Sequence, residues 1–212
     1  MIKIERSHPA PSSLALKQSH NSFDVIERLY IDFHEKCYIC GLKGLQDPEV
    51  EHLLPHKNGN FPERRFDWNN LYLSCGHCNN VKSKAVYDEK ILDCCTVDPE
   101  ENLIFRLNDN NVEVKQKVFN EINEKTSQLI NEVFNLKNTG LRVEKSKHRI
   151  EELQKEMNIL YKFLEKYIIN PNSSITLRTL KAILKKESAF SEFKRSYVRE
   201  NIVHYPKLAA YI

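Results

Sequence analysis

The 212-residue chain holds little glycine and proline, one tryptophan and no long hydrophobic run. Five glycines and eight prolines are too few for a collagen-like or low-complexity protein. No apolar run approaches the roughly 20 residues that cross a bilayer, and the first residues lack the apolar stretch of a secretory signal. The sequence therefore predicts a cytoplasmic protein without a membrane segment. Its 41% hydrophobic residues are sufficient for a folded, helix-rich core.

The net charge of +3 is unevenly distributed along the chain. Residues 1–100 hold 12 Lys and Arg against 15 Asp and Glu, whereas residues 101–212 hold 20 against 14. A basic surplus can bind a phosphate backbone because binding releases counterions. The surplus is equally typical of a solvated helical surface with mixed charges, so charge alone does not identify a partner.

Changes in composition divide the chain into three regions. Residues 1–36 predict an extended arm and a short helix, residues 37–95 a loop-rich segment with two cysteine pairs, and residues 96–212 a hairpin followed by a basic, helical region. Asn21 or Ser22 can cap the first helix. The apolar face expected for this helix comprises Phe23, Ile26, Leu29, Tyr30 and Phe33.

The third region begins with the pattern of a hairpin and an amphipathic helix. Residues 103–114 form two apolar runs around Asn108–Asn111, whose Asn and Asp residues tolerate the positive φ of a tight turn. The helix that follows is expected to end at Asn138-Thr139-Gly140. Its apolar face comprises Val118, Ile122, Leu129, Val133 and Leu136.

Two more helical segments are expected after this point. Asn170-Pro171-Asn172 separates them, and Ser174 or Thr176 can cap the second. Their apolar faces are Val143, Ile150, Leu153, Met157, Leu160 and Leu164 in the first, and Leu177, Leu180, Leu184, Phe193 and Tyr197 in the second. The first face has heptad spacing, which fits either burial against neighbouring helices or an intermolecular coiled coil.

Four of the six cysteines form two close pairs, Cys37-x-x-Cys40 and Cys75-x-x-Cys78. Four thiolates at this spacing fit a closed tetrahedral Zn²⁺ site, which leaves no position for a substrate and is therefore structural. A thioredoxin-like redox pair or two unrelated pairs are the alternatives, but neither pair has a βαβ context. Cys94-Cys95 has no partner at zinc spacing and is expected to pack in the core.

Between and after the cysteine pairs lie polar residues that a structural zinc site does not need. Glu51-His52 interrupts an apolar run, and Asn79 follows Cys78 directly. In a strand, the side chains of Glu51 and His52 point to opposite faces unless a bulge re-aims one of them. A carboxylate and an amide oxygen, completed by waters, suit Mg²⁺ or Mn²⁺. The sequence thus predicts a second divalent metal held by Glu51 and Asn79.

The order of these blocks, Cys-x-x-Cys, Glu-His-Leu-Leu-Pro, Asn-Asn-Leu and Cys-x-x-Cys-Asn-x-x-Lys, resembles the zinc-knuckle variant of the HNH nuclease family. The resemblance implies an α+β fold in which a small zinc-stapled ββα-metal core is embedded in a mostly α-helical chain. It also implies that His52 is the general base, that Glu51 and Asn79 bind the catalytic metal, and that Asn70 steadies the loop that carries the base.

Two residues depart from the commoner family pattern. Glu51 stands where Asp is more usual, so the carboxylate is one methylene longer and its ligand position can differ. Asn79 stands where His is frequent, which shifts the metal preference further toward Mg²⁺ or Mn²⁺. The motif is therefore an HNN variant, and neither change removes a catalytic role.

A softer resemblance spans most of the chain. Ile4-x-Arg6 with Pro11-x-x-Leu14, the HNH core, the Asp98-Pro99 turn with its hairpin, and the helical tail together resemble HNH nucleases of Septu-type and retron-associated bacterial anti-phage systems. This resemblance implies a cognate ATPase partner that restrains or activates the nuclease, and retron RNA or DNA as a further possible component of the complex.

Several of these residues also have purely structural interpretations. Asn79 can be a helix N-cap, and Asn69 can replace Asn70 as the motif asparagine, although Asn70 is the one that precedes leucine as in the family motif. His56 and His77 can contact phosphate or simply be surface residues. The possible DNA contacts are Arg64, Arg65, Lys82 and Lys84.

Together with the family resemblance, the sequence predicts an endonuclease with structural Zn²⁺ and catalytic Mg²⁺ or Mn²⁺, and the resemblance implies DNA as the substrate. Two alternatives stay open. A non-catalytic zinc module could bind nucleic acid or a partner protein through the helical tail, and an RNA-directed nuclease would use the same residues as a DNA-directed one.

Overall fold

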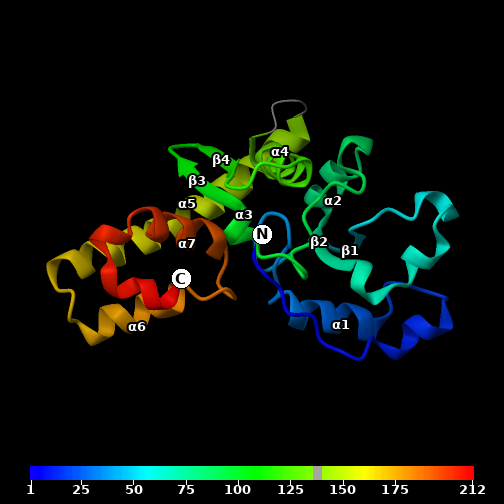
Figure 1. Cartoon of the computed structure of the whole chain (residues 1–212), viewed down its shortest axis with the longest axis horizontal. Helices are drawn as coiled ribbons and strands as arrows, with labels where there is room; N and C mark the ends of the chain where they lie inside the picture. Colours follow the sequence, from blue (N-terminus) through cyan, green and yellow to red (C-terminus); the bar gives the residue numbers. More distant parts are fainter. Residues whose placement is uncertain (136–139) are drawn as a thin grey trace.

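The computed structural model describes residues 1–135 and 140–212, with the side chains of residues 140–142 left undescribed. Two short antiparallel hairpins lie among helices that make up most of the remaining chain (Figure 1). The elements in chain order are α1 (Phe23–Asp32), β1 (Pro48–His52), β2 (Leu71–Cys75), α2 (Gly76–Lys82), α3 (Pro99–Asn102), β3 (Leu103–Asn108), β4 (Asn111–Gln116), α4 (Glu121–Asn135), α5 (Gly140–Ile169), α6 (Ser174–Ile183) and α7 (Ser191–Glu200).

The first hairpin and α2 form a small ββα unit. β1 pairs with β2 without a bulge, from Pro48 opposite Cys75 to His52 opposite Leu71. Every residue of β2 is buried, and the ring of Tyr72 packs against Phe33, which precedes the first cysteine pair, and Tyr38, which lies between its two cysteines. α2 begins directly after β2, so the second cysteine pair lies across a strand-to-helix junction. The predicted α+β class, with a ββα core inside a mostly helical chain, is confirmed.

The N-terminal arm packs along the ββα unit. The backbone amide of Ile4 donates to the Cys94 carbonyl at 2.9 Å, and the Trp68 indole donates to the Ser7 carbonyl at 2.9 Å. The arm therefore shares a core with the segment that follows it.

The predicted apolar face of α1 is partly wrong. Leu29 is fully buried and Phe33, just after the helix, is also buried, but Phe23 is 81% exposed and Val25 takes the buried position in the first turn. Ser22 stands at the N-cap position without a capping side-chain hydrogen bond. Periodicity located the helix, while the packing partner decided which apolar residues it covers.

The hairpin predicted around Asn108–Asn111 is confirmed. β3 and β4 pair from Leu103 opposite Gln116 to Asn108 opposite Asn111, and Asp109 in the two-residue turn has a φ of +52°. Phe105 on β3 packs against Phe193 of α7, with ring centroids 5.5 Å apart. The hairpin is thereby attached to the C-terminal helices.

The helix α4 buries less of its predicted face than expected. Leu129 and Val133 are fully buried, but Ile122 is 47% exposed and Val118, which lies before the helix, is 50% exposed. The expected residue Leu136 and most of the predicted helix end at 138–140 lie outside the described residues.

The heptad face of α5 is buried within the chain. Leu153, Met157, Leu160 and Leu164 are all at most 2% exposed. Burial against neighbouring helices therefore accounts for the heptad spacing. The break before α6 is confirmed, but Ser173, rather than Ser174 or Thr176, caps α6 by accepting from the Thr176 amide.

The elements are arranged with the ββα unit and α1 on one side and α5–α7 on the other (Figure 1). The second hairpin and α4 lie between them, and α4 contacts both α2 and α5. In the described part of the chain, no helix is long and apolar enough to cross a membrane.

Candidate functional site

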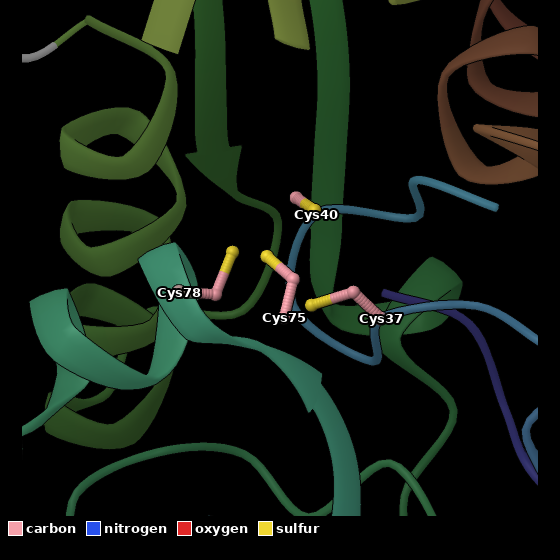
Figure 2. Close-up of side chains that lie close together, drawn as sticks. All are labelled: Cys37, Cys40, Cys75 and Cys78. Atoms are coloured by element: carbon pink, nitrogen blue, oxygen red, sulfur yellow. The ribbon is translucent and has the colours of Figure 1, made fainter. Parts of the chain in front are cut away.

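The four cysteines of the two pairs converge at one buried point. Cys37 and Cys40 come from the loop before β1, Cys75 ends β2 and Cys78 lies in α2, and their sulfur atoms all lie within 4.8 Å of one another (Figure 2). Zn–S bonds of about 2.3 Å in a tetrahedron require S–S separations of about 3.8 Å. The cluster therefore fits a structural zinc ion, which would hold the first loop to the strand-to-helix junction.

A residue of the helical tail contacts this cluster. The Arg149 guanidinium on α5 is buried and its Nη2 lies 2.9 Å from the Cys75 sulfur. Burial opposes the charge, but the surrounding thiolates raise the pKa of Arg149 above its usual range. Because Zn²⁺ with four thiolates carries two net negative charges, Arg149 balances part of that charge. Sequence reasoning missed this residue because 74 positions separate it from Cys75.

Substituting Arg149 with glutamine is expected to weaken zinc retention by about tenfold, the usual cost of losing an outer contact to a metal ligand. The rate of zinc transfer to a chromogenic chelator measures this effect. Arg178→Gln is the matched control, because Arg178 is exposed on α6. Equal zinc loss from the two variants would show that Arg149 does not support the cluster.

His52 is half-buried at the last position of β1. Its Nε2 lies 3.1 Å from the Arg65 carbonyl oxygen, which can only accept, so Nε2 carries the proton. Nδ1 is then the nitrogen with the free lone pair. Burial lowers the pKa of His52 to about 4, with further lowering from His20 and His56. The ring is therefore neutral at physiological pH, the form that a general base requires.

Asn70 fastens the loop that follows His52. Its Oδ1 accepts from the Leu54 amide at 2.8 Å, and its Nδ2 donates to the carbonyls of Leu54 and Arg64, both at 2.9 Å. Asn69 is exposed instead, and only its backbone N–H is seen to donate, to the Asp67 carboxylate. Of the two asparagines, Asn70 is the one whose side chain holds the loop after His52.

Glu51 is buried in an ion pair. Lys82 Nζ lies 2.7 Å from Glu51 Oε1, and the Tyr38 hydroxyl donates to Oε2 at 2.7 Å. Burial raises the pKa of Glu51, although Lys82 and Tyr38 oppose the rise. Lys82 also donates to the carbonyls of His52 and Leu53, at 3.1 and 3.0 Å. The pair thus connects α2 to the end of β1.

Asn79 lies inside α2 rather than at its start. Cys75 occupies the N-cap position, so the N-cap interpretation of Asn79 is wrong. Its amide nitrogen donates to Glu49, a carboxylate on the same strand as Glu51 that sequence reasoning did not single out. The amide oxygen is the atom available to a metal.

Glu51, His52 and Asn79 line one cleft of about 290 Å³, together with His56, Lys57, Lys82 and Asp88. A carboxylate and an amide oxygen are donors that Mg²⁺ and Mn²⁺ favour. Each carboxylate oxygen has a second lone pair, so Glu51 can bind a metal while it keeps Tyr38. The donor types therefore suit a divalent metal, but Lys82 and Tyr38 already bond the two oxygens of Glu51 in this structure.

The four predicted DNA contacts differ in availability. Lys82 is buried with three partners and is withdrawn from this role. Arg64 pairs with Glu89 at 2.6 Å, and Lys84 pairs with Glu132. Arg65 is exposed, and its guanidinium lies over the ring of Phe66. Arg65 is therefore the candidate best placed to meet a phosphate.

The two histidines that the sequence analysis considered as possible phosphate contacts, His56 and His77, lie in different surroundings. His77 is buried, and its Nε2 lies 3.0 Å from the Val133 carbonyl, so neither the phosphate nor the surface interpretation holds for it. His56 lines the cleft. Cys94 is buried and Cys95 half-buried, as the packing interpretation predicts.

Residues 37–85 match the model of the HNH endonuclease family. This segment contains all four clustered cysteines, the hairpin β1–β2 and α2. The match supports nuclease activity in general. No curated protein matches the chain.

Proposed function

We propose that the chain is a metal-dependent endonuclease that hydrolyses DNA phosphodiester bonds at the cleft beside His52. The observation that carries the proposal is the fixed imidazole. The Arg65 carbonyl holds Nε2, which leaves Nδ1 as the basic atom of a residue that shares a cleft with Glu51 and Asn79.

In this mechanism His52 Nδ1 accepts a proton from a water molecule, which attacks phosphorus. Asn70 keeps the loop after β1 in place, so the base does not move relative to the cleft. A divalent metal held by Glu51 and Asn79 would supply Lewis-acid stabilisation of the charge that develops on the phosphate. As the new P–O bond forms, the bond between phosphorus and the 3′ oxygen breaks and the 3′ oxygen takes a proton from solvent water, so the products carry 5′-phosphate and 3′-hydroxyl ends. One site per chain nicks one strand, so a double-strand break requires two events.

The ends of the product test this chemistry. DNA ligase should reseal the nicks directly, because it requires a 5′-phosphate beside a 3′-hydroxyl. Nicks that need kinase or phosphatase treatment before ligation would contradict the proposed direction of attack. Matched DNA and RNA strands of one sequence then identify the substrate, and preferential cleavage of RNA would favour the RNA-directed alternative.

The buried pair of Glu51 and Lys82 also fits a non-catalytic zinc module, in which the pair only stabilises the fold. Breaking a buried pair by removing one partner typically costs about 3–5 kcal/mol, whereas replacing both charges is far milder. Glu51→Gln should therefore unfold at lower urea concentration, and Glu51→Gln with Lys82→Met should recover most of that loss. If Glu51 holds the catalytic metal, as proposed, neither the single nor the double variant should cleave DNA.

The recovery in the double variant separates stability from catalysis. A double variant that regains both its unfolding midpoint and wild-type nicking would exclude Glu51 from the reaction and favour the zinc module. Unfolding followed by circular dichroism and plasmid nicking by the same preparations provide the two readings.

We further propose that this nuclease is the effector of a Septu-type or retron-associated anti-phage system in the bacterial cytoplasm, with an ATPase partner. The similarity of the arm, core, hairpin and tail to such nucleases supports this role. Co-purification with a cognate ATPase from the source cells, followed by nicking with and without ATP, tests the partnership. Failure to co-purify, with nicking unchanged by ATP, would remove the ATPase from the proposal. Recovery of RNA or DNA with the purified complex would support the retron component, and its absence would remove that component.

A further inference from the structure

Three imidazoles from separate segments lie together: His52 and His56 line the cleft, and His20 packs against the ring of His52. His20 comes from the arm before α1, His52 ends β1, and His56 follows in the next loop. The ring of His52 lies 4.8 Å from that of His20 and 5.0 Å from that of His56, measured between centroids. The proposed general base therefore has an imidazole neighbour from the arm and another from the cleft wall.

Both neighbouring rings contain a nitrogen without a partner. The Nδ1 atoms of His20 and His56 are buried and make no hydrogen bond in the structure. In the described residues only six buried side-chain polar atoms are in this state, and two of them belong to these rings. An unpaired buried nitrogen is destabilising. Two such atoms beside one base point to a ligand that pairs with the rings.

The surrounding charges indicate an anionic ligand. Arg65 is exposed nearby and, after burial, is the main cause that lowers the pKa of His20. The carboxylates of the cleft already have cationic partners: Glu51 pairs with Lys82, and Asp88 lies 3.5 Å from Lys57. Neither carboxylate is therefore left over for an imidazole.

We propose that His20 and His56 are further substrate-contacting residues, whose N–H groups donate hydrogen bonds to the non-bridging oxygens of a phosphodiester beside His52. The two donors orient the phosphate toward the water at His52 and stabilise the charge that develops on its oxygens. This inference rests on the proposed nuclease function. It also makes the arm a part of the active site.

Paired substitutions separate a hydrogen-bond donor from a packing role. Phenylalanine at position 20 or 56 keeps a ring but removes both nitrogens, whereas glutamine keeps an N–H donor. His20→Phe and His56→Phe should each lower kcat by about 10²-fold, with smaller changes in KM. His20→Gln and His56→Gln should recover part of this loss. The phenylalanine variants should unfold at the wild-type temperature or above it, because an unpaired buried nitrogen has been removed.

The control is His204→Phe, an exposed histidine in the C-terminal region, which should behave as wild type. Wild-type kcat in the phenylalanine variants would overturn the inference, because rings alone would then suffice. Equal losses in the phenylalanine and glutamine variants, with lowered unfolding temperatures, would also overturn it, because the residues would then be purely structural.

A binding assay with a short DNA duplex distinguishes this inference from the proposed function. No divalent ion is added, so that the DNA is not cleaved, and no chelator is added, so that the cysteine cluster keeps its zinc. Each phenylalanine variant should bind about tenfold more weakly, as expected for a lost hydrogen bond to a charged group. If the wild type binds DNA more tightly than the phenylalanine variants but cleaves nothing, the nuclease function is contradicted and the phosphate contact stands. A wild-type chain that cleaves, with variants that bind and cleave equally well, would contradict the contact alone.

Discussion

Replacing His52 with alanine is expected to slow DNA cleavage by about 10²- to 10⁴-fold, the usual contribution of a general base. The ring is neutral and half-buried, and its Nε2 bonds to the Arg65 carbonyl. Because His52 is only half-buried and takes no part in the four-cysteine cluster, removing its ring should leave zinc content and folding intact. Single-turnover nicking of a supercoiled plasmid measures the rate constant.

His204→Ala is the matched control for this substitution, since His204 is exposed in the C-terminal region. Free imidazole added to the His52→Ala chain should restore part of the rate by acting as the missing base. A rate within about threefold of wild type, well short of the usual contribution of a base, would assign proton removal to another group.

Removing the ion from the four-cysteine cluster is expected to unfold the ββα unit. Structural zinc can contribute on the order of 10 kcal/mol, which is comparable with the total stability of a typical domain. Cys75→Ser should have the same effect, because Cys75 joins β2 to α2 and also contacts Arg149. The expected result is loss of both the thermal transition and cleavage.

The control for Cys75→Ser is Cys95→Ser, a half-buried cysteine outside the cluster. Metal analysis should give one zinc per wild-type and Cys95→Ser chain, and none for Cys75→Ser. A cooperative thermal transition at the wild-type temperature in metal-free protein would contradict the structural role of the cluster.

The local parts of the fold could be predicted because their signals lie within a few residues of one another. The spacing of the cysteine pairs predicted the cluster, and Asn and Asp between two apolar runs predicted the β3–β4 hairpin. The heptad face of α5 predicted its buried residues, although not the helices that cover it.

Apolar periodicity failed where the packing partner ends. Phe23 and Ile122 continue the expected stripes but are exposed in the structure. The burial of Lys82 was missed for a different reason. It lies one helical turn after Asn79 in α2, and its reach to Glu51 depends on how α2 packs on β1.

The long-range parts of the site could not be predicted from the sequence. His20 contacts the His52 ring from the arm, and Arg149 reaches the cluster from α5. Neither residue belongs to the motif, and single polar residues in an arm or on a helix carry no signal of a partner. The contacts of His20 with His52 and of Arg149 with Cys75 form only when separate regions of the chain pack together.

Plasmid nicking by the purified, zinc-loaded wild-type chain shows whether this cleft hydrolyses phosphodiester bonds. With Mg²⁺ or Mn²⁺, alone or with a cognate ATPase, the wild-type chain should nick supercoiled DNA, and the His52→Ala chain should leave most of it intact over the same time. Equal nicking by both chains, or none by the wild type under any of these conditions, would show that the cleft beside His52 is not a nuclease site.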